Sequence, residues 1–306
     1  MLDGVWLRKL AYLGSAYAPE WFKRGSPHLI AGLTFALHKE RRRASVRNME
    51  RVLGTDRFTA HWAALRMYAE FAFCTSETME NHSPRAVPMR IDAPPEYAVL
   101  DAIAAGRGAV VVTGHIGSWD IAAKGLRDKE CRVHVVMGRE LDPATQEFVE
   151  GTRARSGVNV ILSDASVFSS LGLVRALQRN EIVAIQLDRA ARAGGVRLLP
   201  FLGAAAPFPS GPFVLARLAG APVIPVFAPR IGRRHYGLHI GRPVDVPRTA
   251  RDPLVLDRVM LEVVAQLETV VRRYPWQWFQ FQDFWPEPAG AEPRLVEPAV
   301  TESGGR

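Results

Sequence analysis

Helical periodicity marks the first 85 residues of this chain. Apolar residues recur every three to four positions through Phe58–Glu80, at Phe58, Trp62, Leu65 and Tyr68, which is the spacing of one face of an α-helix. A stretch with several prolines, residues 81–97, follows. The pattern therefore predicts a helical region over residues 1–85, ended by a connection without regular structure.

From residue 100 onward, short apolar runs alternate with helical stretches. The candidate strands are Ala109–Val112, Val133–Met137, Val158–Leu162, Ile182–Leu187, Val223–Phe227 and Tyr236–Ile240. The candidate helices include Ile121–Arg127, Val167–Gln178 and the amphipathic Leu254–Arg273. This alternation predicts an α/β domain over residues 86–286, with a mixed central sheet flanked by helices. The tail, residues 287–306, is rich in proline, glycine and glutamate and is expected to be loose.

Charge is concentrated at the N-terminal end. The 306 residues carry 39 Lys and Arg against 31 Asp and Glu, a net charge of +8, and residues 1–57 hold eleven of the former and five of the latter. A basic excess at one end suits an anionic partner, either nucleic acid or an acidic lipid surface. A basic face in contact with solvent alone is the alternative. With two cysteines, a disulfide framework and a four-thiolate zinc site are both excluded.

Aromatic residues accompany the N-terminal basic residues. Trp6 lies beside Arg8, and Trp21 and Phe22 precede Lys23. Such interleaving is typical of a headgroup boundary. The longest uncharged run, residues 198–216, contains four prolines and cannot form an unbroken spanning helix. The N-terminal region is therefore a candidate for peripheral attachment to an anionic membrane surface.

One histidine stands where α/β sheets place their ligand sites. Residues 108–120 read GAVVVTGHIGSWD, so His115 follows a strand and a glycine, and Asp120 comes five residues later. The two side chains can meet if His115 lies before the next helix and folds back. A histidine that only satisfies a buried acid is the alternative. The sequence has no G-x-S-x-G, Walker A, G-x-G-x-x-G, H-E-x-x-H or C-x-x-C motif. His115 therefore suits the activation of a substrate hydroxyl.

The stretch HIGSWD, residues 115–120, resembles the H-x4-D/E motif of bacterial glycerolipid and lysophospholipid acyltransferases. Further blocks make the chain similar to the lipid A biosynthesis lauroyl/myristoyl branch, which includes phosphatidylinositol mannoside acyltransferase. These blocks contain Arg139, then Arg153 and Arg155, then Asp188 and Arg189, then Ser210 and Gly211. The third block lacks the glutamate of the glycerol-3-phosphate branch, and Ser210 stands in its place. The single hydrophobic anchor usual in the lauroyl enzymes is also missing from these residues.

The resemblance implies a function and a set of site residues. The donor is a fatty acyl thioester of coenzyme A or acyl carrier protein, and the acceptor is a hydroxyl of a membrane glycolipid or lysophospholipid. His115 is the general base, and Asp120 holds its tautomer. The arginines, Asp188, Ser210 and Gly211 are expected to bind substrate, with backbone amides at residues 117–118 or 210–211 stabilising the oxyanion. No metal or cofactor is expected.

The same reasoning implies a location and leaves two alternatives. The location is the cytoplasmic face of the inner membrane, with peripheral attachment. A thioesterase or hydrolase in which His115 activates water is one alternative. A basic nucleic-acid-binding protein is the other, although no RRM, KH or zinc-finger signature is present and no nucleic acid is expected.

Two apolar segments complete the sequence-based picture. Residues 198–216 are expected to supply an apolar slot for the acyl chain. The segment Trp276–Trp285 has six aromatic residues in ten. It predicts either a plug that closes the core against the sheet or a wedge that touches lipid.

Overall fold

The structure is a computed structural model. It describes residues 5–94, 98–127, 131–138, 143–144, 146–147, 151, 159–162, 167–189, 195–248 and 253–285. Arg139, Arg153, Arg155 and the tail 287–306 lie outside these residues, so the predictions made for them stay predictions. Among the described residues, no helix is long and apolar enough to cross a membrane.

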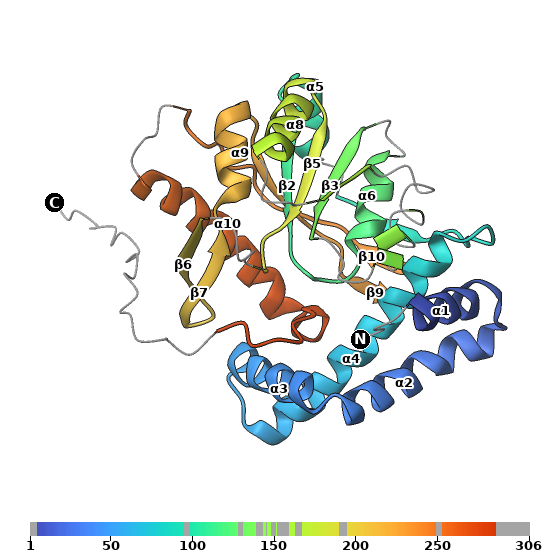
Figure 1. Cartoon of the computed structure of the whole chain (residues 1–306). Coiled ribbons are helices and arrows are strands. Elements are labelled where there is room, and N and C mark those ends of the chain that lie inside the picture. Colours follow the sequence, from blue (N-terminus) through green and yellow to red (C-terminus); the bar gives the residue numbers. More distant parts are fainter. Residues whose placement is uncertain are drawn as a thin grey trace.

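A six-stranded mixed sheet forms the centre of the α/β domain (Figure 1). Its strand order is β11-β8-β2-β5-β3-β4, with β11 antiparallel to β8 and the other pairs parallel. The bounds are β2 Ala109–Thr113, β3 Val133–Met137, β4 Asn159–Leu162, β5 Ile182–Gln186, β8 Val223–Phe227 and β11 His239–Ile240. This confirms the predicted fold class, and each predicted strand except the last has one counterpart.

Smaller strands lie outside the central sheet. The last predicted strand, Tyr236–Ile240, divides at Leu238 because its two halves pair with different partners. Its first half joins a three-stranded sheet of order β1-β10-β9. The strands are β1 Arg90–Asp92, β9 Arg230–Gly232 and β10 His235–Gly237, and a separate hairpin consists of β6 Val196–Phe201 and β7 Ala204–Pro209.

Helices cover both faces of the central sheet and form a further layer beside it. The bounds are α1 Val5–Tyr17, α2 Glu20–Leu37, α3 Lys39–Leu53, α4 Arg57–Asn81, α5 Ala98–Ala104, α6 Trp119–Arg127, α8 Val167–Gln178, α9 Gly211–Ala219, α10 Pro253–Arg273 and the 3₁₀ turn η1 Pro275–Gln277. Helix α10 ends just before Pro275, as its sequence predicts.

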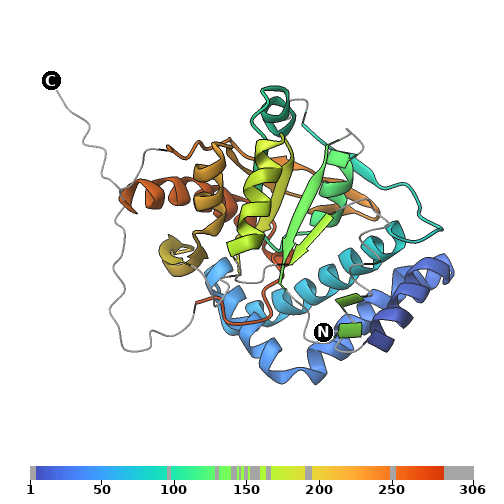
Figure 2. The ribbon, with the colours of Figure 1, turned by 45° about the horizontal axis from the view of Figure 1, so that its top comes forward.

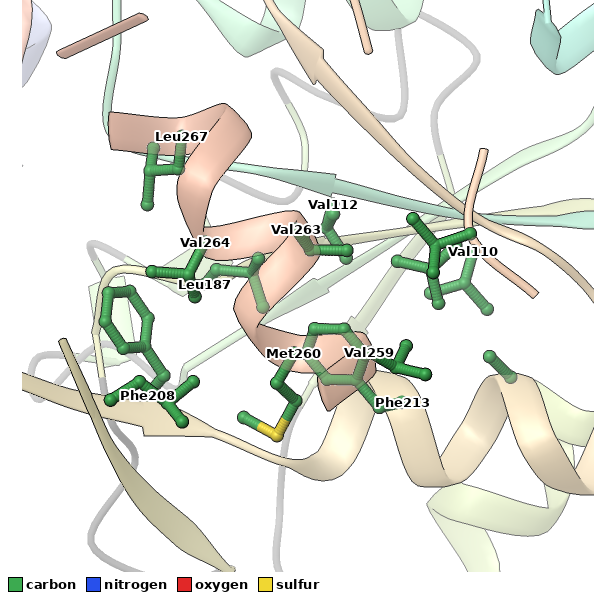
Figure 3. Close-up of a cluster of buried hydrophobic side chains, with 14 of the residues drawn as sticks. Val110, Val112, Leu187, Phe208, Phe213, Val259, Met260, Val263, Val264 and Leu267 are labelled. Carbon is green, nitrogen blue, oxygen red and sulfur yellow. The ribbon is translucent and has the colours of Figure 1, made fainter. Parts of the chain in front are cut away.

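Side chains of β2 alternate between the two faces of the sheet. Val110 and Val112 pack against α8, α9 and α10, whereas Ala109 and Val111 pack against α5 and α6. Successive side chains of a strand point to opposite faces, so a strand buried on both faces is apolar throughout. Figure 3 shows the α10 side of this core, which includes Val259 and Val263 of α10 together with Val110 and Val112 of β2.

Residues 198–216 form part of this core. They make the hairpin β6–β7 and the start of α9. Phe201 and Phe208 are fully buried and pack against each other edge to face. The prolines that forbid one long helix here stand in the hairpin strands and at the start of α9, where their missing N–H is tolerated. The structure shows a packing role for this segment, and the acyl slot stays a prediction.

The aromatic C-terminal segment is mainly a core plug. Trp278 is fully buried, and Phe279 and Phe284 are nearly so. The Trp278 ring contacts Phe284 and Phe201. The plug, one of the two open interpretations, is the one that the structure supports.

The helices α1 to α4 lie together beneath the α/β part in the views of Figures 1 and 2. Asp56 caps α4 by accepting hydrogen bonds from the backbone N–H groups of Phe58 and Thr59. Further along α4, the buried Glu77 accepts hydrogen bonds from Arg230 and from the hydroxyl of Tyr236. This buried polar contact connects the helical layer to the three-stranded sheet.

Candidate active site

His115 lies just beyond the carboxyl end of β2, next to the end of β5. The two strands run parallel, with Thr113 opposite Gln186. Two residues further along each strand come His115 and Asp188. Ligand sites of open α/β sheets lie at this edge, and the matched register brings these two side chains together.

Asp188 holds His115 at two points. The ring nitrogen Nδ1 of His115 is 2.7 Å from Asp188 Oδ1, and the backbone N–H of His115 donates to Asp188 Oδ2, also at 2.7 Å. A carboxylate only accepts hydrogen bonds, so Nδ1 carries the proton in this contact. Gly114 permits the close approach, because a Cβ at this position would lie 3.2 Å from Asp188 Oδ2 and 3.0 Å from Leu267.

Two side chains of the C-terminal segment complete the surroundings of Asp188. The indole N–H of Trp278 donates to Asp188 Oδ2 at 2.9 Å. The amide Nε2 of Gln280 donates to the same oxygen at 2.9 Å and to the Asp188 carbonyl at 3.0 Å. Asp188 is fully buried, and its carboxylate accepts four hydrogen bonds from these residues and His115.

The environment keeps Asp188 ionised. Burial acts to raise the pKa of Asp188, but the charge and hydrogen bonds of His115, together with the charge of Arg189, outweigh burial and lower this pKa from 3.8 to about 2. A carboxylate beside an imidazole both fixes the ring and stabilises the imidazolium. The pair is therefore arranged for base catalysis by the other ring nitrogen.

The imidazole has one nitrogen left for a substrate. With Nδ1 bonded to Asp188, Nε2 of His115 has no hydrogen-bond partner among the described residues. About 17% of the His115 side chain is exposed. An imidazole with Nδ1–H and an unprotonated Nε2 accepts a proton at Nε2.

Within the described residues, no group of three or more His, Cys, Asp or Glu could hold a metal ion.

The turn that carries His115 is fixed by backbone contacts on both sides. Phe279 N–H donates to the His115 carbonyl at 2.8 Å, and Gly117 N–H donates to the Gln277 carbonyl at 3.2 Å. On the opposite side, Ser118 N–H donates to the Ala228 carbonyl at 3.0 Å. Gly117 has φ +59°, and a Cβ there would lie 1.9 Å from the Ala228 oxygen. The turn therefore requires glycine.

These contacts rule out three of the amides expected to stabilise an oxyanion. The N–H groups of Gly117 and Ser118 donate to the backbone carbonyls of Gln277 and Ala228. Ser210 N–H and Ser210 Oγ both donate to the Gly195 carbonyl at 2.8 Å. Ser210 is buried and joins the end of β7 to the residue before β6, and Gly211 begins α9. Ser210 thus makes a structural contact, and the substrate-binding role expected of Ser210 and Gly211 stays a prediction.

The predicted partner of His115 differs from the one that the structure places there. Asp120 lies in the first turn of α6, beyond the glycine turn. The ring nitrogen that the sequence-based prediction assigns to Asp120 is bonded to Asp188. The prediction that Asp120 fixes the tautomer is therefore corrected, and its wider role in catalysis stays a prediction.

Of the remaining predicted residues, Arg189 is exposed beside the pair. Asp188, which the sequence analysis assigns to substrate binding, is instead the partner of the imidazole. Trp278 and Gln280 are functional candidates that sequence reasoning missed. The only sequence signal for them was the dense aromatic segment that contains them. This pattern does not predict which acceptor an indole N–H in the segment would bind.

Two comparisons with known proteins bear on the family of this chain. The family model described as "Bacterial lipid A biosynthesis acyltransferase" matches residues 3–286. The chain is also similar to the phosphatidylinositol mannoside acyltransferase of Mycobacterium tuberculosis (strain CDC 1551 / Oshkosh), with 28% identity over 187 residues. That alignment covers 60% of this chain and 56% of the relative, so the match spans little more than half the length of the curated protein. The family match extends over nearly the whole chain, and the chain therefore belongs to the bacterial lipid A biosynthesis acyltransferase family.

Proposed function

We propose that the protein is an acyltransferase that moves a fatty acyl chain from a thioester of coenzyme A or acyl carrier protein to a hydroxyl of a membrane glycolipid or lysophospholipid. The observation that carries the proposal is the hydrogen bond from His115 Nδ1 to the buried, ionised Asp188 at the carboxyl edge of the sheet. This pair leaves Nε2 of His115 as the base.

The proposed reaction follows from the chemistry of this pair. Nε2 of His115 takes the proton of the acceptor hydroxyl as its oxygen attacks the thioester carbonyl carbon. Asp188 stabilises the imidazolium that forms, as a buried carboxylate does in hydrolase triads. The tetrahedral intermediate collapses, the C–S bond breaks and the thiolate takes the proton from Nε2. A thiol has a pKa of about 8.5, so the thiolate is a good leaving group.

A glycolipid is the favoured class of acceptor. The relative in Mycobacterium tuberculosis is named for phosphatidylinositol mannoside, and the family description names lipid A. Both names denote membrane lipids with sugar hydroxyls. A sugar hydroxyl is a weak nucleophile until a base removes its proton, which is the role proposed for His115.

The helical layer supports attachment of the protein to the membrane that holds such an acceptor. Thirteen of the eighteen large apolar side chains exposed by the described residues belong to α1, α2 or the start of α4. Trp6 is 76% exposed and Trp21 is 74% exposed. Isolated exposed apolar residues are ordinary, but this concentration indicates an interaction surface.

Charge favours an anionic bilayer as the partner of this surface. Exposed basic residues accompany the apolar ones, among them Lys9, Arg24, Lys39 and Arg43. The ammonium of Lys9 lies 5.8 Å from the ring centre of Trp6. Apolar side chains that enter the acyl region and cations that remain at the headgroups are the pattern of peripheral interfacial helices. The proposed location is therefore the cytoplasmic face of the inner membrane.

Acyl transfer can be tested with purified protein and one defined donor. Palmitoyl-CoA is supplied with and without vesicles made from the lipids of a strain that lacks the gene, and free thiol and lipid mass are both measured. We expect thiol release that depends on the vesicles and a lipid heavier by one palmitoyl group. Equal thiol release without vesicles, with free palmitate as the product, would identify a thioesterase and overturn the proposal.

A further inference from the structure

The carboxylate of Asp188 is held mainly by side chains from far along the chain. Three donors converge on its Oδ2 atom: the backbone N–H of His115, the indole of Trp278 and the amide of Gln280. The other oxygen, Oδ1, meets the imidazole. Because Oδ2 is fixed by three donors, the carboxylate cannot rotate without losing them, and Oδ1 stays directed at Nδ1.

Gln280 is itself held in place. Its Nε2 also donates to the Asp188 carbonyl at 3.0 Å, so it bonds the backbone and the side chain of the same residue. The backbone carbonyl of Gln280 accepts hydrogen bonds from Ser45 Oγ and Asn48 Nδ2 of α3, both at 3.3 Å. Ser45, Asn48, Asp188 and Gln280 are all buried. The helical layer therefore supports the residue that supports Asp188.

Trp278 both packs in the core and donates a hydrogen bond to Asp188. Its ring is fully buried against Phe201 and Phe284, and its N–H is 2.9 Å from the carboxylate. Its backbone forms an antiparallel bridge with Ile116, the residue after His115. An indole without an acceptor would be costly at this depth, so the bond to Asp188 satisfies both groups.

We infer that Trp278 and Gln280 are positioning residues for acyl transfer, which act through Asp188 by keeping its carboxylate directed at Nδ1 of His115. This inference deepens the proposed function and rests on His115 being its base. The chemistry is sequential: the two donors fix Asp188, Asp188 fixes the Nδ1–H tautomer, and that tautomer leaves Nε2 basic.

Trp278 and Gln280 could also serve only to fill the core. The test must therefore separate this structural role from the positioning of Asp188. Trp278→Phe and Gln280→Met each remove the donor while keeping most of the side-chain volume. Trp276→Phe and Gln282→Met are the matched controls on the same segment, because the Trp276 ring faces Arg66 and the Gln282 side chain is exposed. Thermal unfolding of each variant checks the fold.

The first measurement is kinetic, with palmitoyl-CoA as donor and vesicles of extracted membrane lipid as acceptor. Trp278→Phe and Gln280→Met are each expected to lower kcat by roughly 10- to 100-fold with KM for palmitoyl-CoA unchanged, since a hydrogen bond to a charged group is being lost. In an Asp188→Asn background, adding Trp278→Phe is expected to cause no further loss. An equal further loss there, or a change in KM alone, would overturn the inference.

The second measurement does not depend on activity. In protein with ¹⁵N-labelled histidine, the His115 resonances, identified by their absence in His115→Ala, report which ring nitrogen carries the proton. We expect the wild type and both controls to show a low-field Nδ1 proton, and Trp278→Phe and Gln280→Met to shift or lose it. An unchanged Nδ1 proton in both variants would contradict the inference. If the shifts occur but His115→Ala still transfers palmitate, the proposed function fails while the positioning of the ring stands.

Discussion

Asp188 accepts two hydrogen bonds from His115, one from the ring Nδ1 and one from the backbone N–H, each at 2.7 Å. The two residues come from neighbouring parallel strands, two positions beyond the matched pair Thr113 and Gln186. The ring and the backbone of the histidine are thus fixed by one buried carboxylate. This relationship decides which nitrogen of the imidazole is free to act on a substrate.

Replacing either of the two candidate carboxylates distinguishes their roles. Asp188→Asn is expected to lower kcat by at least ~10²-fold, because an amide at this position favours the wrong tautomer of His115. Asp120→Asn is expected to lower kcat by less than Asp188→Asn does. Steady-state kinetics with palmitoyl-CoA measures both. A larger loss in Asp120→Asn would return the role of the acid partner to the H-x4-D residue.

Acid stability should depend on Asp188. Its pKa is about 2 in the folded protein, below the ordinary value of about 3.9 in an unfolded chain. The unfolded chain therefore binds the proton first, and the stabilisation is complete above about pH 4 and is lost as the pH falls from about 4 to 2. The contribution lies between about 2 and 3 kcal/mol.

Urea unfolding at a series of pH values between 2 and 5 measures this effect, with Asp188→Asn as the comparison. The free energy of unfolding should fall less steeply with decreasing pH in the variant than in the wild type. Parallel curves for the two proteins would show that Asp188 is not the group that titrates.

The backbone at Gly117 should not tolerate a side chain. Gly117→Ala places a Cβ 1.9 Å from the Ala228 oxygen in addition to the unfavourable positive φ. Gly106→Ala is the control, because Gly106 also has a positive φ but no atom within 4 Å of the added Cβ. We expect Gly106→Ala to cost about 1 kcal/mol and Gly117→Ala to cost at least about 2 kcal/mol more, with loss of activity. Chemical denaturation measures both costs, and equal costs would mean that the turn can shift away from Ala228.

Membrane binding should depend on the exposed apolar residues of the helical layer. Leu10→Ala and Leu37→Ala are each expected to weaken binding to vesicles containing phosphatidylglycerol by about 10-fold, because each removes apolar area that enters the acyl region. Leu218→Ala on α9, at a similarly exposed position, should bind like the wild type. Sedimentation with vesicles measures binding, which should also weaken as salt increases. If Leu218→Ala weakens binding as much as the other two variants do, the proposed surface is wrong.

The sequence predicted where the strands of the central sheet lie along the chain, but not the order in which they pair. Apolar runs such as Val133–Met137 and Val223–Phe227 became strands with the same bounds, because a strand buried on both faces is marked by its own residues. Which strands lie side by side depends on contacts between distant residues. The pairing of β2 with β5, and with it the contact between His115 and Asp188, was therefore not accessible from spacing.

In the site, as in the sheet, local features could be predicted from the sequence and contacts between distant residues could not. His115 was identified correctly as the residue at the carboxyl end of β2, since a strand, a glycine turn and a histidine are local features. Asp188 was recognised as a candidate but given a different role. The donors Trp278 and Gln280 reach Asp188 across some 90 residues, and no local pattern encodes such a contact. The hairpin β6–β7 was missed because its prolines were interpreted only as helix breakers.

In the proposed reaction, Nε2 of His115 removes the proton from the acceptor hydroxyl. The most direct test is the single-turnover transfer of palmitate from palmitoyl-CoA to extracted membrane lipid by His115→Ala, with His235→Ala on β10 as the matched control. We expect the rate of His115→Ala to fall by at least ~10²-fold with the fold intact, since general-base catalysis contributes about 10²–10⁴-fold, and His235→Ala to keep the wild-type rate. A folded His115→Ala protein that transfers palmitate at the wild-type rate would contradict the claim.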